Sequence, residues 1–300
     1  MPPLSAALPQ ISTNVRFAAS RLLFPELAGE LAERLFLTPP RSRDAAAAAL
    51  DLIDARSSIL EHKGRSIVSW RWGSRDAPAV LLAHGWGGHA AQMRAFVFPL
   101  LSAGYRVIAF DQPAHGVSEG RLTGLPDFAD VLAEVAWHHG EVDGVIAHSM
   151  GGAGTALAIA RGLRVRRVVT IGASLDVSFF SQQFARWYWI PRRVISAMQA
   201  SVEERFGVRW AELDMARLAP RIAASALVIH DRNDRKVPWR QGASFARAWP
   251  GARLYTTRGL GHSRILQDEH VTALAAQFIA GRSSVAGVAV PALPHPAPLY

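Results

Sequence analysis

Short apolar runs that alternate with helical stretches constrain the fold of this 300-residue chain more than any other feature. The runs cover residues 79–84, 105–110, 144–148, 165–171, 225–230 and 253–257. Helical stretches are expected near Gln92–Ala103, Asp127–His138, Gln241–Ala248 and His270–Ile279, with a further one that begins at Met150. Strands that are apolar along almost their whole length are typical of a parallel sheet covered by helices on both faces. The sequence therefore predicts an α/β, doubly wound, mostly parallel sheet.

Two shorter β-like runs precede this series. Residues 58–62 and 66–72 have strand composition, and Lys63-Gly64 between them favours a tight hairpin.

Three segments depart from the alternation. Residues 1–56 have helical spacing, and we expect a helical extension packed against the main domain. A basic amphipathic start also occurs on membrane surfaces, which leaves a second, less favoured interpretation. Residues 176–220 are helical and aromatic, so we expect a lid above the carboxyl ends of the strands, where open parallel sheets bind ligands. The Pro- and Ala-rich residues 283–300 predict a disordered tail. The core is assigned to residues 57–175 and 221–282.

The charge balance is strongly basic, with a formal net charge of +9. Only Lys63 and Lys236 among the 33 basic residues are lysines, and the arginines are spread along the chain without a dense cluster. We therefore expect no nucleic-acid partner. The absence of cysteine excludes disulfides, thiolate catalysis and cysteine-ligated metals. Neither a secretory signal nor an apolar window of about 18 residues is evident, so we expect a cytoplasmic protein without a transmembrane segment.

The segment Ala147-His148-Ser149-Met150-Gly151-Gly152 joins an apolar run to a helical stretch. This arrangement is typical of a nucleophile elbow, a sharp turn that lifts a serine hydroxyl clear of the sheet. Small neighbours are needed because the turn brings the helix close to the strand. The alternative is a serine that only caps the helix. We expect Ser149 to be a nucleophile.

Five motifs occur in order, each at the end of a strand-like run. They are HGWGGHA (84–90), FDQPAHGVS (110–118), AHSMGG (147–152), HDRNDRKVP (230–238) and GLGHSRIL (259–266). Over about residues 58–282 the chain resembles the α/β-hydrolase superfamily, most of all bacterial serine hydrolases of the esterase and lipase-like kind with a helical cap. The resemblance implies a triad of Ser149 as nucleophile, Asp234 as acid and His262 as base. It also implies an oxyanion hole formed by the amides of Trp86 and Met150.

The acid position has a competitor in Asp231, which directly follows a strand-like run. Asp234 is favoured because it matches the position of the acid in the family. Asp111 also ends a strand, but we expect it to hold the loop that carries His115 and Ser118. A metal site at His84, His89 and His115 is disfavoured because neither an HExxH motif nor a carboxylate cluster accompanies them. We expect no metal and no cofactor.

Aromatic residues of the expected lid suggest a substrate with an apolar acyl or aromatic part. The residues expected to bind it are Phe179, Phe180 and Trp187. A serine at the elbow favours acyl transfer to water over dehalogenation or epoxide opening, which use an aspartate there. The sequence thus predicts a carboxylic ester hydrolase that forms an acyl-enzyme. An acyltransferase, thioesterase, amidase or carbon–carbon bond hydrolase with the same triad stays open, as does a non-catalytic protein that binds a small ligand.

Overall fold

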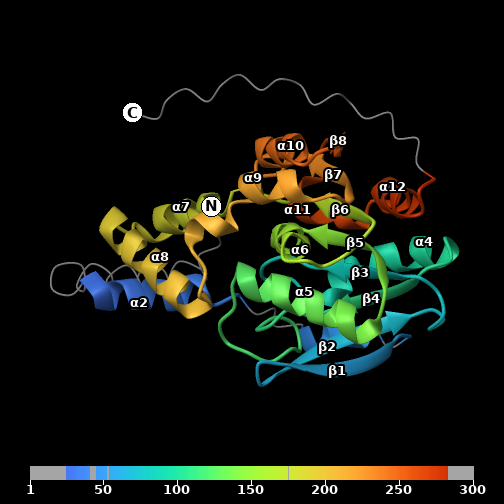
Figure 1. The fold of residues 1–300 in the computed structure, drawn as a ribbon, viewed down its shortest axis with the longest axis horizontal. Coiled ribbons are helices and arrows are strands. Elements are labelled where there is room, and N and C mark those ends of the chain that lie inside the picture. Colours follow the sequence, from blue (N-terminus) through green and yellow to red (C-terminus); the bar gives the residue numbers. More distant parts are fainter. Residues whose placement is uncertain (1–24, 41–44, 53, 175, 283–300) are drawn as a thin grey trace.

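A computed structural model describes residues 25–40, 45–52, 54–174 and 176–282. At its centre lies an eight-stranded sheet with the strand order β1-β2-β4-β3-β5-β6-β7-β8 (Figure 1). The strands are β1 (Arg56–His62), β2 (Arg65–Trp72), β3 (Ala79–Ala83), β4 (Arg106–Phe110), β5 (Val142–His148), β6 (Arg167–Ile171), β7 (Ser225–Asp231) and β8 (Arg253–Thr257). Only the β1–β2 and β2–β4 pairs are antiparallel. The predicted α/β, mostly parallel sheet is confirmed.

Helices cover both faces of the sheet. The elements around the sheet are α3 (Ala45–Leu50), η1 (Ala90–Phe96), α4 (Val97–Ser102), α5 (Leu125–His139), α6 (Met150–Ala160), α10 (Trp239–Ala248), α11 (Gly261–Arg264), η4 (Ile265–Gln267) and α12 (Glu269–Ile279). In β3, Leu81 packs in the core shared with α5 and α6, whereas Leu82 packs in the core shared with η1, α4 and α12. Both side chains are fully buried. Successive residues of a strand thus enter opposite cores, which explains the uninterrupted apolar runs.

The predicted hairpin at Lys63-Gly64 is present. Lys63 and Gly64 both have positive φ angles, of 50° and 71°, as a tight type I′ turn requires.

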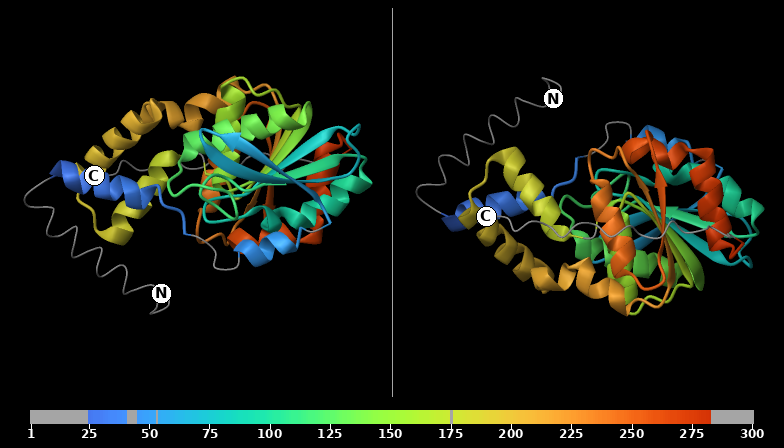
Figure 2. Two further views of the ribbon diagram at one scale, coloured as in Figure 1. Left: turned by 90° about the horizontal axis from the view of Figure 1, so that it is seen from below. Right: turned by 90° about the horizontal axis from the view of Figure 1, so that it is seen from above.

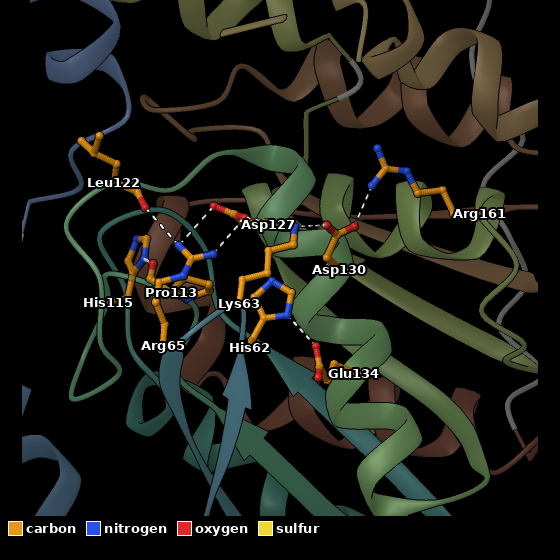
Figure 3. A network of polar contacts seen from close by, with 10 residues as sticks. All are labelled: His62, Lys63, Arg65, Pro113, His115, Leu122, Asp127, Asp130, Glu134 and Arg161. Carbon is orange, nitrogen blue, oxygen red and sulfur yellow. Dashed lines mark hydrogen bonds and ion pairs between the residues drawn. The ribbon is translucent and has the colours of Figure 1, made fainter. Parts of the chain in front are cut away.

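A network of charged side chains ties this hairpin to α5 (Figure 3). Lys63 Nζ lies 2.8 Å from Asp130 Oδ2, and Arg65 Nη2 lies 3.1 Å from Asp127 Oδ1. Arg65 also donates a hydrogen bond to the carbonyl of Leu122, in the loop that leads into α5. Because Asp127 is buried and its arginine partner is largely so, this pair is screened less than a surface ion pair. The network fixes the loop between β4 and α5, which borders the candidate site.

The helix expected over Gln92–Ala103 is two elements, the 3-10 helix η1 followed by α4. Pro99 accounts for the difference, because it has no N–H with which to continue an α-helical ladder from η1. With α4 beginning at Val97, Pro99 falls in the first turn, where no such bond is needed.

Between β6 and β7 the chain forms a group of helices. They are α7 (Val177–Tyr188), α8 (Arg192–Phe206), η2 (Trp210–Leu213), α9 (Met215–Leu218) and η3 (Ala219–Arg221). The first two lie beyond the sheet at one end of the molecule, together with α2 (Pro25–Phe36) (Figures 1 and 2).

The two described N-terminal helices pack on different parts of the molecule. Helix α3 contacts η1 of the main domain, but α2 packs chiefly on α8. The two helices approach so closely that a Cβ atom on Gly29 would lie 2.7 Å from Ala197 Cβ. At this contact Glu33 is buried and accepts hydrogen bonds from Ser201 and Arg205. We call the unit formed by α2, α7 and α8 the cap.

The predicted tail, residues 283–300, and the first 24 residues of the predicted extension lie outside the described residues. Within the described ranges, each helix is too short or too polar to cross a membrane.

Candidate active site

The strand order reverses direction next to β3. From β3 the chain passes to β4, which lies on one side of β3. It then passes to β5, which lies on the other side of β3, and continues outward from β5 to β8. The loops that follow β3 and β5 therefore part at the carboxyl edge of the sheet, which is the place where open α/β sheets bind ligands. Trp86 lies in the first of these loops, and Ser149 directly follows β5.

Ser149 occupies the sharp turn from β5 into α6. Its backbone angles, φ 52° and ψ −122°, are uncommon for a residue with a side chain. The turn is held by the amide of Ser149, which donates a hydrogen bond to the carbonyl of Ile171 over 2.9 Å. The hydroxyl does not cap α6. The alternative of a purely capping serine is therefore not supported by the geometry.

Small residues around Ser149 permit this turn. A Cβ atom on Gly85 would lie 2.7 Å from Ser149 Cβ, and one on Gly151 would lie 2.5 Å from the carbonyl oxygen of His84. Gly152 faces Ala173 at 2.7 Å by the same measure. The loop after β3 thus lies against the serine itself, and the start of α6 lies against the end of β3.

Replacing Gly151 with alanine is expected to destabilise the fold by about 1–3 kcal/mol or more, because the backbone of β3 would have to move. Urea denaturation of Gly151→Ala and of the unsubstituted protein measures this difference. An unchanged free energy of unfolding would contradict the close approach of α6 to β3.

His262 and Asp234 are joined by a hydrogen bond. His262 Nδ1 lies 2.7 Å from Asp234 Oδ2, and the Asp234 carboxylate also accepts from the amides of Lys236 and Val237. His148, the residue before Ser149, donates from Nε2 to the carbonyl oxygen of His262 over 2.9 Å. The imidazole rings of His148 and His262 are 4.6 Å apart between centroids. The loop after β8 is therefore attached directly to the turn that carries Ser149.

Asp234 is buried, and burial alone would raise its pKa. Hydrogen bonds from His230 and His262 outweigh that effect and hold the pKa of Asp234 well below its usual range. An ionised Asp234 retains the proton on Nδ1 of His262 and leaves Nε2 as the basic nitrogen. Burial lowers the pKa of His148 to about 3, so His148 is neutral beside this pair.

Asp231 does not bond to His262. Its carboxylate accepts from the hydroxyl of Thr257 and from the amides of Leu260 and Asn233. These contacts fix the loops after β7 and β8, and the second of these loops contains His262. Geometry thus separates the two aspartates: Asp234 contacts the histidine and Asp231 holds its loop.

His230 was not singled out in the sequence, yet it contacts Asp234. Its Nε2 donates to the carbonyl of Val237 over 2.9 Å and lies 3.4 Å from Asp234 Oδ2. The ring is fully buried, and α10 packs so closely that a Cβ atom on Gly242 would lie 2.0 Å from His230 Nδ1. The sequence did contain a signal for this contact, because His230 ends an otherwise apolar run and a buried polar side chain needs a hydrogen-bond partner.

Two histidines hold the loops after β3 and β4 together. His84 Nε2 accepts from the amide of Gln112, and His115 Nε2 accepts from the amide of Gly87, each over 2.9 Å. The Nδ1 atom of His84 donates to the carbonyl of Gly85, and that of His115 donates to the carbonyl of Pro113; Figure 3 shows the second of these bonds. Both rings are therefore neutral and use both nitrogens within the protein, which explains these histidines without a metal. Among the described residues, no group of three His, Asp or Glu is arranged to hold a metal ion.

The amides of Trp86 and Met150 donate no hydrogen bond to any residue that the structure describes. Trp86 follows Gly85, which contacts Ser149, and Met150 is the first residue of α6, where the helix dipole is positive. Both amides thus lie in segments adjoining Ser149 and are free to donate.

Asp111 holds the loop after β4, as expected from the sequence. Its two carboxylate oxygens accept from the amides of Ala90 and Val117, and its carbonyl accepts from the hydroxyl of Ser118. Burial dominates over these hydrogen bonds and raises the pKa of Asp111 to about 6.

A raised pKa makes the effect of Asp111 on stability depend on pH. Its contribution to the folded state is full below the pKa of the unfolded chain, 3.8, and is lost as the pH rises through about 6. The cost of Asp111→Asn is therefore expected to be larger, by on the order of 2–3 kcal/mol, near pH 4 than near pH 8. Urea denaturation of both proteins at each pH measures it. An equal cost at both values would show that the carboxyl group is not perturbed.

The aromatic residues expected to bind substrate differ in their surroundings. Phe179 and Phe180 are partly buried in the first turn of α7, with ring centroids 5.5 Å apart. Trp187 is 65% exposed at the other end of α7. Phe184 and Ile190 bury that part of the cap against α2 and α8, and Trp187 stays at the surface.

Comparisons with known proteins agree with this architecture. The sequence model described as the alpha/beta hydrolase family matches residues 80–277. A magnesium-chelatase 30 kDa subunit from Rhodobacter capsulatus is 42% identical over 108 residues, which make up 35% of this chain and 37% of that protein. A bifunctional esterase/perhydrolase from Acinetobacter calcoaceticus is 36% identical over 93 residues, 30% of this chain and 34% of that protein. The matches thus span about a third of these curated relatives.

An esterase of known structure from a Rhodococcus species has a similar fold. It superposes with a TM-score of 0.56 at 19% sequence identity and covers 77% of this chain and 100% of its own.

Proposed function

Because this chain belongs to the alpha/beta hydrolase family, we propose that it is a serine hydrolase that cleaves carboxylic esters through an acyl-enzyme on Ser149. Asp234 acts as the acid and His262 as the base. The observation that carries the proposal is the junction of three loops. Ser149 lies in the strained turn after β5, and His262 is bonded both to Asp234 and to His148, the neighbour of Ser149.

The first half of the reaction forms the acyl-enzyme. His262 Nε2 takes the hydroxyl proton of Ser149 while Oγ attacks the ester carbonyl, and the carbonyl π electrons move to the oxygen. The amides of Trp86 and Met150 donate to this oxyanion, and one such donor contributes roughly 3 kcal/mol in serine hydrolases. The tetrahedral intermediate then collapses, and the alcohol leaves with the proton carried by His262.

The second half reverses these roles with water. His262 removes a proton from water, and the hydroxide attacks the acyl carbonyl. As the second tetrahedral intermediate collapses, the bond from the acyl carbon to Ser149 Oγ breaks, His262 returns the proton to Oγ, and the carboxylic acid departs. Throughout, ionised Asp234 stabilises the imidazolium form of His262, which is the charged state that each transition state creates. Neither half needs a cofactor.

The cap is the proposed lid. Its helices α7 and α8 follow β6, within the residues 176–220 expected to form the lid, and α7 carries Phe179 and Phe180 in its first turn. We assign these two side chains to the apolar acyl or aromatic part of the substrate. The esterase/perhydrolase relative supports an ester as the substrate class. The magnesium-chelatase subunit relative is not named as a hydrolase, so a non-catalytic role is the alternative that needs exclusion.

A panel of p-nitrophenyl esters of increasing acyl length tests the proposal. We expect turnover of at least the short esters without added metal or cofactor. Parallel assays with thioesters, anilides and alcohol acceptors separate an esterase from a thioesterase, an amidase and an acyltransferase. A folded protein that turns over no member of any series would contradict the proposal and favour the binding protein.

A further inference from the structure

The connection between α7 and α8 exposes two tryptophans among three arginines. Trp187 is 65% exposed and Trp189 is 83% exposed, and the three arginines also face solvent. We call this group the cap tip; it consists of Arg186, Trp187, Trp189, Arg192 and Arg193. The proposed hydrolysis uses none of these side chains.

The backbone keeps Trp189 at the surface. Trp189 ends α7 in the left-handed conformation, with φ 56° and ψ 40°, and the next amide, of Ile190, bonds back to the carbonyl of Ala185. Glycine is the usual residue at this position of a helix end. Here the turn buries Ile190 beside Phe184 and leaves the Trp189 indole in water. Stability alone favours neither the tryptophan nor its exposure.

The charged side chains of the segment that carries the cap tip have one sign. Residues 177–202 contain three arginines and no lysine, aspartate or glutamate. Arg192 and Arg193 stand in the first turn of α8, which contains no acidic residue and where the helix dipole is already positive. Helix α2, which packs on α8, contributes the exposed Glu26 and Glu30 to the same cap. The cap tip itself therefore presents three positive charges, which attract anions.

We propose that the cap tip docks on an anionic lipid surface. Tryptophan prefers the headgroup level of a bilayer, where its ring meets apolar chains and its N–H meets water. Arginine binds phosphate groups, and clustered basic residues are drawn to the negative surface of anionic membranes. A stable protein interface needs roughly 800 Å² on each partner, more than one short connection between helices offers. A lipid surface requires no such complementary shape.

The cap tip is also placed for this contact. Helices α7 and α8 belong to the cap, which forms one end of the molecule beyond the sheet (Figures 1 and 2). Docking at that end leaves both faces of the core free. The inference does not depend on the triad, because it concerns binding and not turnover.

Sedimentation with vesicles tests this contact in the Ser149→Ala protein, so that no lipid is hydrolysed. We expect binding to mixed phosphatidylcholine and phosphatidylglycerol vesicles and much weaker binding to pure phosphatidylcholine. The Trp187→Ser/Trp189→Gly variant is expected to lower the affinity about tenfold or more. Glycine at position 189 suits the left-handed turn, so this variant retains the helix end. The matched control is Trp137→Ser in α5, where the tryptophan is 84% exposed, and it is expected to bind unchanged.

A second pair of variants separates the cap tip from the general positive charge of the protein. Arg186→Gln/Arg192→Gln is expected to lower affinity for the anionic vesicles about tenfold, and Arg166→Gln/Arg217→Gln, with the same change in net charge, far less. The side chains of Arg166 and Arg217 are 76% and 73% exposed. Equal losses in the two double variants, or no loss in either cap tip variant, would overturn the proposal. Equal binding to both kinds of vesicle would also overturn it.

Discussion

Replacing Ser149 with alanine is expected to lower kcat for a short p-nitrophenyl ester by on the order of 10⁶. The substitution removes only the hydroxyl that is proposed to form the acyl-enzyme. Ser149 is 6% exposed and its hydroxyl does not cap α6, so the fold loses little. Product release followed by absorbance gives kcat, and thermal unfolding verifies that the variant is folded.

The chain offers a matched control in Ser174. This serine is also buried and follows β6, next to β5 in the sheet, but its hydroxyl bonds to Gln241. Ser174→Ala is expected to retain activity within about tenfold, because it removes only neutral hydrogen bonds, to Gln241 and to the backbone of Asp176. Activity retained by Ser149→Ala, or lost equally in both variants, would remove Ser149 from the mechanism.

Replacing Asp234 with asparagine is expected to lower kcat by on the order of 10⁴. Asparagine has the same shape, but it carries no charge and does not fix the His262 tautomer that is protonated on Nδ1. Asp231→Asn is the paired variant. Asp231 bonds to Thr257 and Leu260 and not to the histidine, so its loss is expected to cost about 1–3 kcal/mol of stability while kcat changes less than about tenfold.

The kinetic constants and urea denaturation curves of both variants decide between the aspartates. A large fall in kcat for Asp231→Asn with an active Asp234→Asn would exchange their roles. Equal falls in both would show that the loop held by Asp231 contributes as much as the charge of Asp234.

The sheet was predictable from sequence because its strands are buried on both faces. A residue such as Leu81 enters one core and its neighbour Leu82 the other, so each strand reads as a continuous apolar run. The hairpin at Lys63-Gly64 was predictable for a local reason, since its turn needs two positive φ angles. Patterns of this kind need no knowledge of distant contacts.

Other features depend on contacts that a local pattern does not specify. Amphipathic spacing indicates that α2 buries one face, but not that the face packs on α8. Composition likewise marks the cap as aromatic without separating the partly buried Phe179 from the exposed Trp187. At the site, the order of the motifs suggested Ser149, Asp234 and His262. The contact of His230 with Asp234 became visible only in three dimensions.

Covalent labelling with a fluorophosphonate, followed by peptide mass spectrometry, tests the nucleophile most directly. We predict one phosphonate per chain, on the peptide that contains Ser149, with labelling abolished in Ser149→Ala and slowed in Asp234→Asn. An enzyme that hydrolyses esters yet carries the label on another residue, or that is not labelled, would contradict the assignment of Ser149.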